Sequence, residues 1–574
     1  MTDRTIEPPD GSAHGPMDRR RFFARCATLG ISGTAFPAAL WALAEGEGRV
    51  TKEMLPNAEA LAGLEFSDAE RELMLEGLNG NLESYEEIRA LSIPNEVYPA
   101  LQFDPIPAGH EPEIPRRPRR RTRRTRVTRP TNLEDVAFWS ITDLSELIQT
   151  RQVTSVELTR MYLDRLERHG PKLECVIRLT EDLALRQAHR ADAELARGVC
   201  RGPLHGIPWG AKDLLAEDEY RTTWGAKPFE EQQIPYDATV VRRLEEAGAV
   251  LIAKLTLGAL AWGDVWFGGK TRNPWNVEQG SSGSSAGSAS ATVAGLVGFS
   301  IGSETWGSIV SPVTRCGASG LRPTFGRVSR YGAMALSWSM DKLGPICRTV
   351  EDCALVLEAI YGPDGQDPTV RDVPFDWDVG LPLEDLRIGY YKSAFGAEHD
   401  WYAYDWKAVE ALRSLGVKPI PIELPETIPT GALSFILSVE AAAAFDELTR
   451  SGRDELLVRQ VEKAWPNVFR QSRLIPAVEY VQANRARTML MGALQTAMEG
   501  IDLFITPSFG KDVLLMTNLT GHPCVTVPHG FSEDGTPVSI SFVGQLFREA
   551  ELLAAAKRYQ DATGFHLRHP KEFG

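Results

Sequence analysis

A Gly- and Ser-rich tract at residues 279–323 carries the densest set of side chains that could do chemistry. It reads QGSSGSSAGSASATVAGLVGFSIGSETWGSIVSPVTRCGASGLRP, so it combines many hydroxyl groups with a backbone that can turn tightly. A flexible linker is the simplest interpretation of this composition. That interpretation fails because an apolar, helix-like segment at 289–301 interrupts the tract before a second Gly/Ser cluster at 302–308. The tract therefore belongs to folded structure and favours serine chemistry.

Two common motifs fit this tract incompletely. A phosphate-binding loop at 302–308 would need the Walker A lysine, which is missing. Residues 283–287, GSSAG, match the G-x-S-x-G nucleophile elbow with Ser285 as the nucleophile. That elbow needs a hydrophobic strand directly before it, and the preceding RNPWNVEQGSS is not one. It would also need a downstream histidine, for which His522 and His529 are the candidates.

A third interpretation covers far more of the chain. Residues 283–323 closely resemble the amidase signature, the Gly/Ser-rich stretch of a large family of serine amide hydrolases. The resemblance continues in LHGIPWGAKD at 204–213, GLRPTFGRVS at 320–329, DKLGP at 341–345 and GHP at 521–523. It extends over about residues 136–566 and implies the α/β amidase signature fold, a central mixed β-sheet with helices on both faces.

The resemblance also implies a catalytic site. Members of the family use a Ser–cisSer–Lys triad, which corresponds here to Ser308 as nucleophile, Ser284 after a cis peptide bond from Gly283, and Lys212 as base. Ser285 is expected to support this loop through hydrogen bonds. The expected oxyanion hole consists of the backbone N–H groups of Thr305, Trp306, Gly307 and Ser308. No metal or cofactor is required, and the expected substrate is a small-molecule amide.

Elementary chemistry supports these assignments. Lys212 follows the apolar run at 207–211, and burial there would lower its pKa until the amine is neutral and can act as a base. The alternative for this lysine is an ion pair with Asp213 or another acid. A serine hydroxyl is a weak nucleophile and needs an adjacent base. Ser284 can bridge Lys212 and Ser308 by donating to one and accepting from the other.

The signature departs from its commonest form, D-x-G-G-S-I-R, because residues 304–310 read ETWGSIV. Trp306 replaces a glycine and is expected to reshape the acyl pocket beside the oxyanion hole. Val310 lacks the usual arginine, and whether Arg315 replaces its contacts is open. The substrate therefore stays unassigned: carboxamides and aryl amides fit, and esters or carbamates suit the same acyl-enzyme chemistry.

The elements that must position these residues begin near residue 136. A capping box at Thr154–Glu157 opens a helix that is expected to stop at Gly170, before an alternating strand at 173–179. Further strands are predicted at 250–253, 388–391, 503–506, 525–527 and 538–542, with helices at 404–415 and 549–563. Strands separated by helices predict a layered sheet.

The N-terminal 44 residues predict export. Arg19, Arg20 and Arg21 precede a mildly apolar stretch that closes on Ala-Leu-Ala at 42–44, a pattern that resembles a twin-arginine signal for the bacterial periplasm. An N-terminal anchor helix is the alternative. No other segment is long and apolar enough to span a membrane, so no stable membrane insertion is expected after signal removal.

Three further regions are expected. Residues 45–112 form a small, acidic, helical region, with a capping box at Ser67–Glu70, and residues 132–574 form the amidase domain. Between them, at 113–131, lies an Arg/Pro-rich linker; its core, residues 115–130, contains nine arginines, three prolines and no acid. We interpret it as a solvated linker. The alternative is contact with an acidic surface: the chain's own acidic body, a membrane or nucleic acid.

Composition limits the remaining classes. The 574 residues carry a net charge of −15 and are 43% hydrophobic, which excludes a disordered or collagen-like chain and makes the body a poor binder of nucleic acid. Six of the seven cysteines follow the signal, and buried free thiols are favoured over disulfides. The main alternative function is the glutaminase-like A subunit of a tRNA-dependent amidotransferase, which RVSRYG at 327–332 resembles. The export signal argues against it. A non-catalytic binding protein is the other alternative, and the oligomeric state is unassigned.

Overall fold

The computed structural model describes residues 50–90, 94–95, 97, 101–122, 126–396 and 402–574. The predicted export signal at 1–44 lies outside these residues and stays a prediction. None of the described helices combines the length and apolar character needed to cross a bilayer. Contacts divide the chain into two compact units, Met1–Pro94 and Asn95–Gly574.

The first unit contains the described helices η1 (Lys52–Met54), α3 (Leu55–Ala62) and α4 (Asp68–Arg89). The predicted capping box is present: Ser67 N donates to Glu70 Oε2 at 2.7 Å and Glu70 N donates to Ser67 Oγ at 3.4 Å. The described helices of the predicted helical region, 45–112, end at Arg89. Residues 101–112 instead belong to the second unit.

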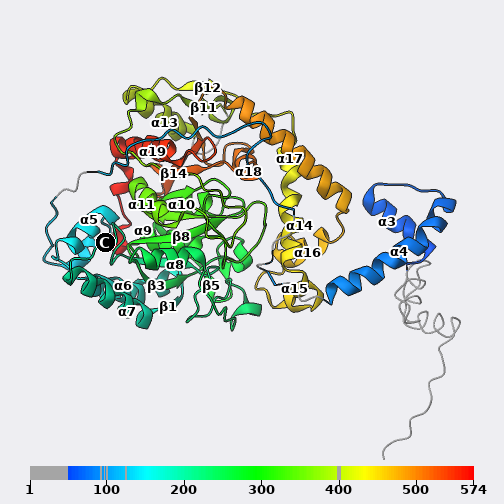
Figure 1. Ribbon diagram of the computed structural model, residues 1–574, viewed down its shortest axis with the longest axis horizontal. Helices are drawn as coiled ribbons and strands as arrows, with labels where there is room; N and C mark the ends of the chain where they lie inside the picture. The colour runs from blue at the N-terminus through cyan, green and yellow to red at the C-terminus, as the bar shows by residue number, and fades with distance from the viewer. Residues whose placement is uncertain (1–49, 91–93, 96, 98–100, 123–125, 397–401) are drawn as a thin grey trace, which may run out of the picture. The chain divides into compact units, whose positions relative to one another are not determined.

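The second unit is built on one mixed β-sheet of eleven strands (Figure 1). In spatial order these are β1 (Val176–Leu179), β3 (Val250–Leu255), β2 (Pro208–Lys212), β8 (Phe299–Glu304), β10 (Lys342–Cys347), β9 (Ser319–Arg322), β14 (Cys524–Phe531), β15 (Pro537–Gly544), β13 (Leu503–Pro507), β11 (Ile388–Tyr391) and β12 (Ile420–Ile422). Strand β2 is parallel to β3 and β8, and β11 is parallel to β12 and β13, while the remaining pairs are antiparallel. The predicted central mixed sheet is confirmed.

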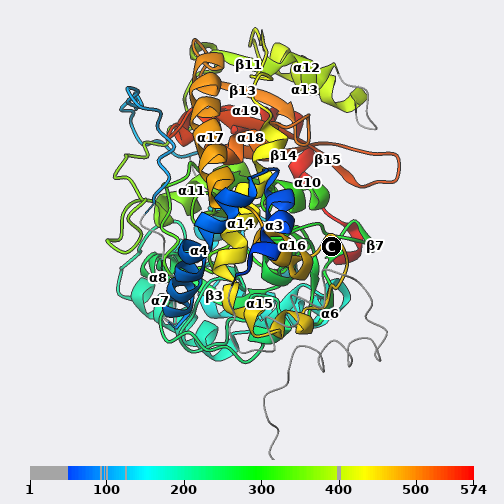
Figure 2. The ribbon, with the colours of Figure 1, turned by 90° about the vertical axis from the view of Figure 1, so that its right-hand side faces the viewer.

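Helices and short strands surround this sheet. Those toward the N-terminal half are η2 (Leu133–Val136), α5 (Ile141–Gln149), α6 (Ser155–Leu173), α7 (Glu181–Ala196), η3 (Lys227–Phe229), α8 (Thr239–Glu246), η4 (Ala259–Ala261) and the two-stranded pairs β4 (Val265–Trp266) with β5 (Gly269–Lys270) and β6 (Arg272–Asn273) with β7 (Asn276–Gly280). Those toward the C-terminus are η5 (Leu383–Asp385), α12 (Lys392–Phe395), α13 (Tyr402–Ser414), η6 (Thr430–Ser434), α14 (Phe435–Ala444), α15 (Asp446–Arg450), η7 (Arg453–Leu456), α16 (Trp465–Ser472), α17 (Ala477–Ala497), α18 (Val513–Leu519), η8 (Phe565–Leu567) and η9 (Lys571–Phe573). Helix α14 packs against both α16 and α17, and lies beside α16 in Figure 2.

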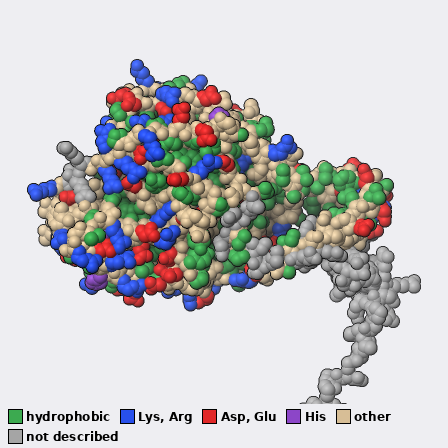
Figure 3. All heavy atoms as spheres, viewed as in Figure 1, with side chains coloured by type: hydrophobic (Ala, Val, Ile, Leu, Met, Phe, Trp, Pro, Cys, Tyr) green, Lys and Arg blue, Asp and Glu red, His purple; other side chains and the backbone are tan. Residues whose placement is uncertain are grey.

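The Arg-rich segment contacts the acidic body of its own chain where it is described. Arg119 Nε lies 3.2 Å from Asp376, and Arg120 and Arg121 each lie 2.7 Å from a carboxylate, those of Asp378 and Glu358. On the face shown in Figure 3, Lys and Arg side chains accordingly lie among Asp and Glu side chains. At these three arginines the interpretation as a purely solvated linker is therefore corrected: the alternative, contact with the chain's own acidic body, is what the structure has.

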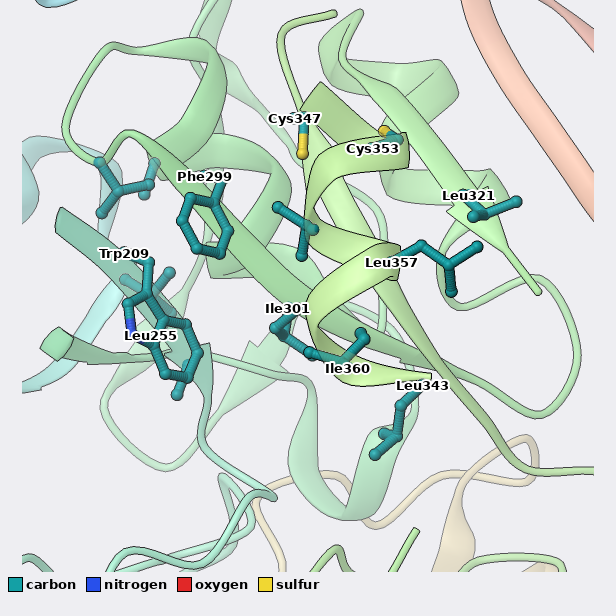
Figure 4. Packing of buried hydrophobic residues seen from close by; sticks show 14 of the residues in the cluster. Trp209, Leu255, Phe299, Ile301, Leu321, Leu343, Cys347, Cys353, Leu357 and Ile360 are labelled. Carbon is teal, nitrogen blue, oxygen red and sulfur yellow. The ribbon is translucent and has the colours of Figure 1, made fainter. Parts of the chain in front are cut away.

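Helices cover both faces of the sheet. Helices α9 (Ala286–Val293) and α10 (Val310–Cys316) pack on one face, and α11 (Val350–Ile360) and α19 (Glu549–Thr563) pack on the other. Ser300 in β8 donates to Ser288 O of α9 at 2.9 Å, whereas the next residue, Ile301, lies beside Ile360 of α11 (Figure 4). Alternate residues of the strand thus face opposite layers, as strand geometry requires.

Most expected elements form, with shifts at their ends. The Thr154–Glu157 capping box has both reciprocal hydrogen bonds, but α6 continues past Gly170 to Leu173, so β1 begins only at Val176. The expected helix-like segment at 289–301 is wrong in its second half. Helix α9 ends at Val293, Gly295 turns with φ of +66°, and β8 starts at Phe299. All six described cysteines are free thiols, five of them buried, as favoured.

Candidate active site

Lys212 is the centre of the site, at the C-terminal end of β2. The side chain is fully buried, and its Nζ lies 2.8 Å from Ser284 Oγ, 2.8 Å from Ser303 Oγ and 3.0 Å from Ser285 Oγ. Three hydroxyls from two Gly/Ser clusters therefore converge on one amine. Burial lowers the pKa of Lys212 well below its ordinary value, although the negative charges of Asp341 and Glu304 oppose that shift. The environment favours the neutral amine, which can act as a base.

The neighbouring acid does not neutralise this lysine. Asp213 lies 3.2 Å from Lys254 of the adjacent strand β3, and both side chains are fully buried. Asp213 also accepts hydrogen bonds from the backbone N–H and the hydroxyl of Thr223, at 2.9 and 2.5 Å. The alternative interpretation of Lys212 as an ion-pair partner of Asp213 is therefore wrong.

Ser284 follows a cis peptide bond from Gly283, as the family resemblance implies. Gly283 is needed for close approach, because a Cβ atom there would meet Gly263 O at 1.9 Å. The next residue, Ser284, accepts a hydrogen bond from the lysine amine through its hydroxyl. The structure thus brings two of the three predicted triad residues into hydrogen-bond contact.

Ser285 supports the lysine instead of acting as an elbow nucleophile. Its Oγ donates to Ser303 O and accepts from Ser303 N, both at 3.1 Å, and the residue is fully buried. The strand that precedes it, β7, pairs only with β6 and lies outside the central sheet. His522 contacts Thr520 and His529 lies 3.8 Å from Asp405, so neither histidine meets Ser285. The nucleophile-elbow interpretation therefore lacks both the preceding strand of the central sheet and the histidine that it needs.

Ser308 lies on a loop between β8 and α10 and lines a cavity of about 390 Å³ together with Gly283, Thr305 and Trp306. Its carbonyl accepts from Ser285 N at 3.1 Å, which joins the two Gly/Ser clusters. Within the described residues, no hydrogen bond links the hydroxyls of Ser284 and Ser308. Their backbone segments are joined through the Ser285 N–H and the Ser308 carbonyl.

The loop at 305–308 leaves backbone donors free. In the described part of the chain, the N–H groups of Trp306, Gly307 and Ser308 donate to no protein acceptor. Gly307 has φ of +82°, the left-handed conformation that suits glycine. The side chain of Thr305 is held by Asp341, to which its hydroxyl donates at 2.5 Å. That bond uses the Thr305 hydroxyl and leaves its backbone N–H without a protein acceptor in the described residues, so the predicted oxyanion-hole donors are all available to a ligand.

Glu304 fixes the end of this loop. It is fully buried and accepts from the N–H groups of Ile309 and Val310 at 2.8 and 2.9 Å. Its other oxygen accepts from Arg322 at 2.8 Å and from Asn518 at 2.7 Å. Burial alone would raise the pKa of Glu304, but Arg322 and the backbone donors outweigh it and lower the pKa to about 2. Glu304 is therefore ionised at neutral pH, and its two oxygens join the residues that follow the loop to Arg322 and Asn518.

Three contributing residues escaped the sequence analysis: Ser303, Glu304 and Asp341. Glu304 occupies the acidic position of the signature and Asp341 begins the DKLGP motif, so both lie in recognisable motifs. Their contacts with the nucleophile loop do not follow from those motifs. No local pattern singles out Ser303. Arg315, the candidate substitute for the usual arginine at Val310, is exposed and donates to Gln279 Oε1 at 3.3 Å.

Known proteins resemble this chain over most of its length. The amidase family model matches residues 157–515. The chain is 36% identical over 477 residues to the A subunit of the glutamyl-tRNA(Gln) amidotransferase of Moorella thermoacetica, covering 75% of this chain and 97% of that protein. The solved peptide amidase from Stenotrophomonas maltophilia superimposes with a TM-score of 0.68 and 29% identity, covering 77% of this chain and 99% of that one. An amidase family protein from Bacillus anthracis superimposes with a TM-score of 0.68 and 25% sequence identity, covering 76% of this chain and 93% of that one.

Proposed function

The chain belongs to the amidase family, and we propose that it hydrolyses amide C–N bonds through an acyl-enzyme on Ser308, with Lys212 as base and Ser284 as proton relay. The observation that carries this proposal is a fully buried lysine whose amine meets the Ser284 hydroxyl at 2.8 Å. Burial favours the neutral amine, and a neutral amine beside a serine relay is the base that a serine nucleophile needs.

The reaction then proceeds in two halves. Ser284 passes a proton to the Lys212 amine and takes the Ser308 proton as the Ser308 oxygen attacks the carbonyl carbon. When the C–N bond breaks, the proton returns through Ser284 to the leaving amine, which leaves an ester on Ser308. Water, deprotonated by the same relay, attacks this ester and releases the carboxylic acid. The Ser284–Ser308 hydrogen bond that the relay requires is of the kind that often tightens only when substrate is bound.

The free N–H groups at the nucleophile loop supply the complementary half of the chemistry. The negative charge that develops on the carbonyl oxygen needs donors already aimed at it, and one such donor contributes about 2.7–4 kcal/mol in an unrelated serine hydrolase. The backbone of Trp306, Gly307 and Ser308 provides them beside the cavity. Glu304 and Asp341 keep this loop in place.

The principal alternative is the amide-hydrolysing component of an amidotransferase, favoured by the 36% identity to the Moorella protein. Such a function would use glutamine as the amide. We prefer a free-standing, exported amidase because of the twin-arginine-like pattern at 17–44, which would direct the folded enzyme to the periplasm. Fractionation of cells that carry the full chain, beside a variant with Arg19, Arg20 and Arg21 replaced by Lys, tests export. Retention of both proteins in the cytoplasm would contradict it.

Hydrolysis by a Ser308→Ala variant tests the proposed chemistry. We expect loss of turnover by about a thousandfold or more across a panel of amides and esters. The matched control is Ser311→Ala, another serine that lines the same cavity but is absent from the Lys212 network. It should fold and keep its activity. Hydrolysis that survives in Ser308→Ala would overturn the assignment.

A further inference from the structure

The cavity at Ser308 has an aromatic and aliphatic wall. Of the described residues that line it, Trp262, Trp306 and Trp465 supply three indole rings, and Leu336, Leu437 and Val468 add aliphatic surface. No Asp, Glu, Lys, Arg or His is among those lining residues. The polar side chains among them are serine and threonine hydroxyls, apart from the indole N–H groups. Hydroxyls and backbone N–H and C=O groups can form hydrogen bonds with an uncharged amide.

Two of the indole rings form a fixed wall, and the third is free. Trp465 Nε1 donates to Leu260 O at 2.9 Å, and the Trp465 ring packs edge-on against Trp262 at 4.8 Å between centroids. Trp306 is 47% exposed and packs against no other aromatic ring in the described part of the chain. A half-exposed tryptophan two residues before the nucleophile offers a ring face to a ligand.

A second cavity, of about 650 Å³, adjoins the first and shares Thr305 and Leu336 with it. It contains charged residues, but they are already engaged. Arg330 lies 2.9 Å from Asp367 and also donates to Trp338 O at 2.7 Å. Asp341, which also lines this second cavity, accepts hydrogen bonds from the Thr305 hydroxyl and from the backbone N–H groups of Leu336 and Ser337. Among the described lining residues, the Ser308 cavity therefore has no charged side chain, and the charged side chains of the second cavity are already engaged by an ion pair or by hydrogen bonds.

We propose that this enzyme selects uncharged amides that carry an aromatic group, and that Trp306 is the residue that determines this specificity. The inference rests on the proposed function, because it concerns the substrate of the same site. A charged group carried into the Ser308 cavity would lose its hydration without gaining a partner, which strongly disfavours binding. The ammonium and carboxylate of glutamine fall under this exclusion, whereas an aryl group can stack on the free Trp306 ring. A volume of about 390 Å³ accommodates an amide of this size.

The test compares kcat/KM for three primary amides: 3-phenylpropanamide, propanamide and the anionic succinamate. For the wild-type enzyme we expect kcat/KM to be highest for 3-phenylpropanamide, lower for propanamide and lowest for succinamate. In Trp306→Gly, the ratio of kcat/KM for 3-phenylpropanamide to that for propanamide should fall about tenfold, and Trp306→Phe should restore most of it. The ratio cancels any general loss caused by a change in the oxyanion loop.

Two further variants control this experiment. Leu567→Ala removes an exposed apolar side chain outside both cavities and should leave the ratio at the wild-type value. Ser438→Lys adds a cation to the cavity wall and should raise the relative kcat/KM for succinamate. Preference of the wild type for succinamate, or an unchanged ratio in Trp306→Gly, would overturn the specificity inference alone. A folded enzyme that hydrolyses no amide or ester would overturn the proposed function and this inference with it.

Discussion

Replacement of Glu304 by Gln tests whether a buried carboxylate holds the nucleophile loop. The carboxylate accepts four hydrogen bonds of 2.7–2.9 Å, two from the backbone of Ile309 and Val310 and two from Arg322 and Asn518. The variant keeps the size of the side chain but removes its charge. It leaves the fully buried Arg322 guanidinium without an anion.

The size of the effect follows from the pKa of Glu304, which is about 2 instead of 4.5. A carboxylate with that pKa contributes about 3 kcal/mol to folding at neutral pH. Because its pKa is lowered, this contribution is present above pH 4.5 and is lost as the pH falls through about 2. Removing one partner of a buried ion pair lowers the free energy of unfolding by about 3–5 kcal/mol, which agrees with the value from the pKa. For a unit of this size we expect the Tm of Glu304→Gln to fall by about 3–6 °C at pH 7.

The assay combines calorimetry with kinetics on one amide substrate, well below the Tm. Besides the stability loss, kcat should fall about tenfold or more, because small displacements of a nucleophile have large effects on rate. The matched control is Glu549→Gln, which breaks another buried pair, 3.0 Å from Arg327, away from the loop. It should lose comparable stability and keep its kcat. A Glu304→Gln enzyme with wild-type Tm and kcat would refute the positioning role of Glu304.

Three other expectations follow from buried or exposed side chains. Since burial lowers the pKa of Lys212, kcat/KM should rise with pH and level off well below 10.5, and a rise confined to the region of 10.5 would argue against a buried base. Lys254→Met leaves Asp213 buried without its partner, so chemical denaturation should show a loss of about 3–5 kcal/mol, and an unchanged midpoint would contradict the pairing. Cys200 is exposed and the other five described cysteines are buried, so brief alkylation followed by peptide mass spectrometry should find Cys200 modified and those five unmodified until denaturation.

Much of the fold is predictable from local sequence patterns. Helix α19 and strand β11 have the predicted bounds of 549–563 and 388–391, because apolar periodicity and flanking polar residues define them locally. The turn at Gly295 is not predictable from this pattern, because α9 and β8 both consist largely of small residues and are buried along their whole length, so neither has a distinguishing period. Helix and strand are hard to separate in such a run.

The site likewise has a part that can be predicted from local motifs and a part that depends on tertiary structure. The signature motifs point to Lys212, Ser284 and Ser308, but the choice of partner for Lys212 depends on strand register. Asp213 is adjacent in sequence yet pairs with Lys254, which only the alignment of β2 against β3 brings close. The contact between Lys212 and Ser303 likewise spans 91 positions and joins different strands. Such contacts follow from tertiary structure and carry no local signal.

Covalent labelling tests the central claim most directly. The purified protein is treated with a serine-directed fluorophosphonate, and the adduct is mapped by peptide mass spectrometry. We predict a label on Ser308 that is lost in Lys212→Ala while that variant stays folded. A label on Ser285, or on Ser308 to the same extent with and without the lysine, would contradict an acyl-enzyme formed by a lysine-activated Ser308.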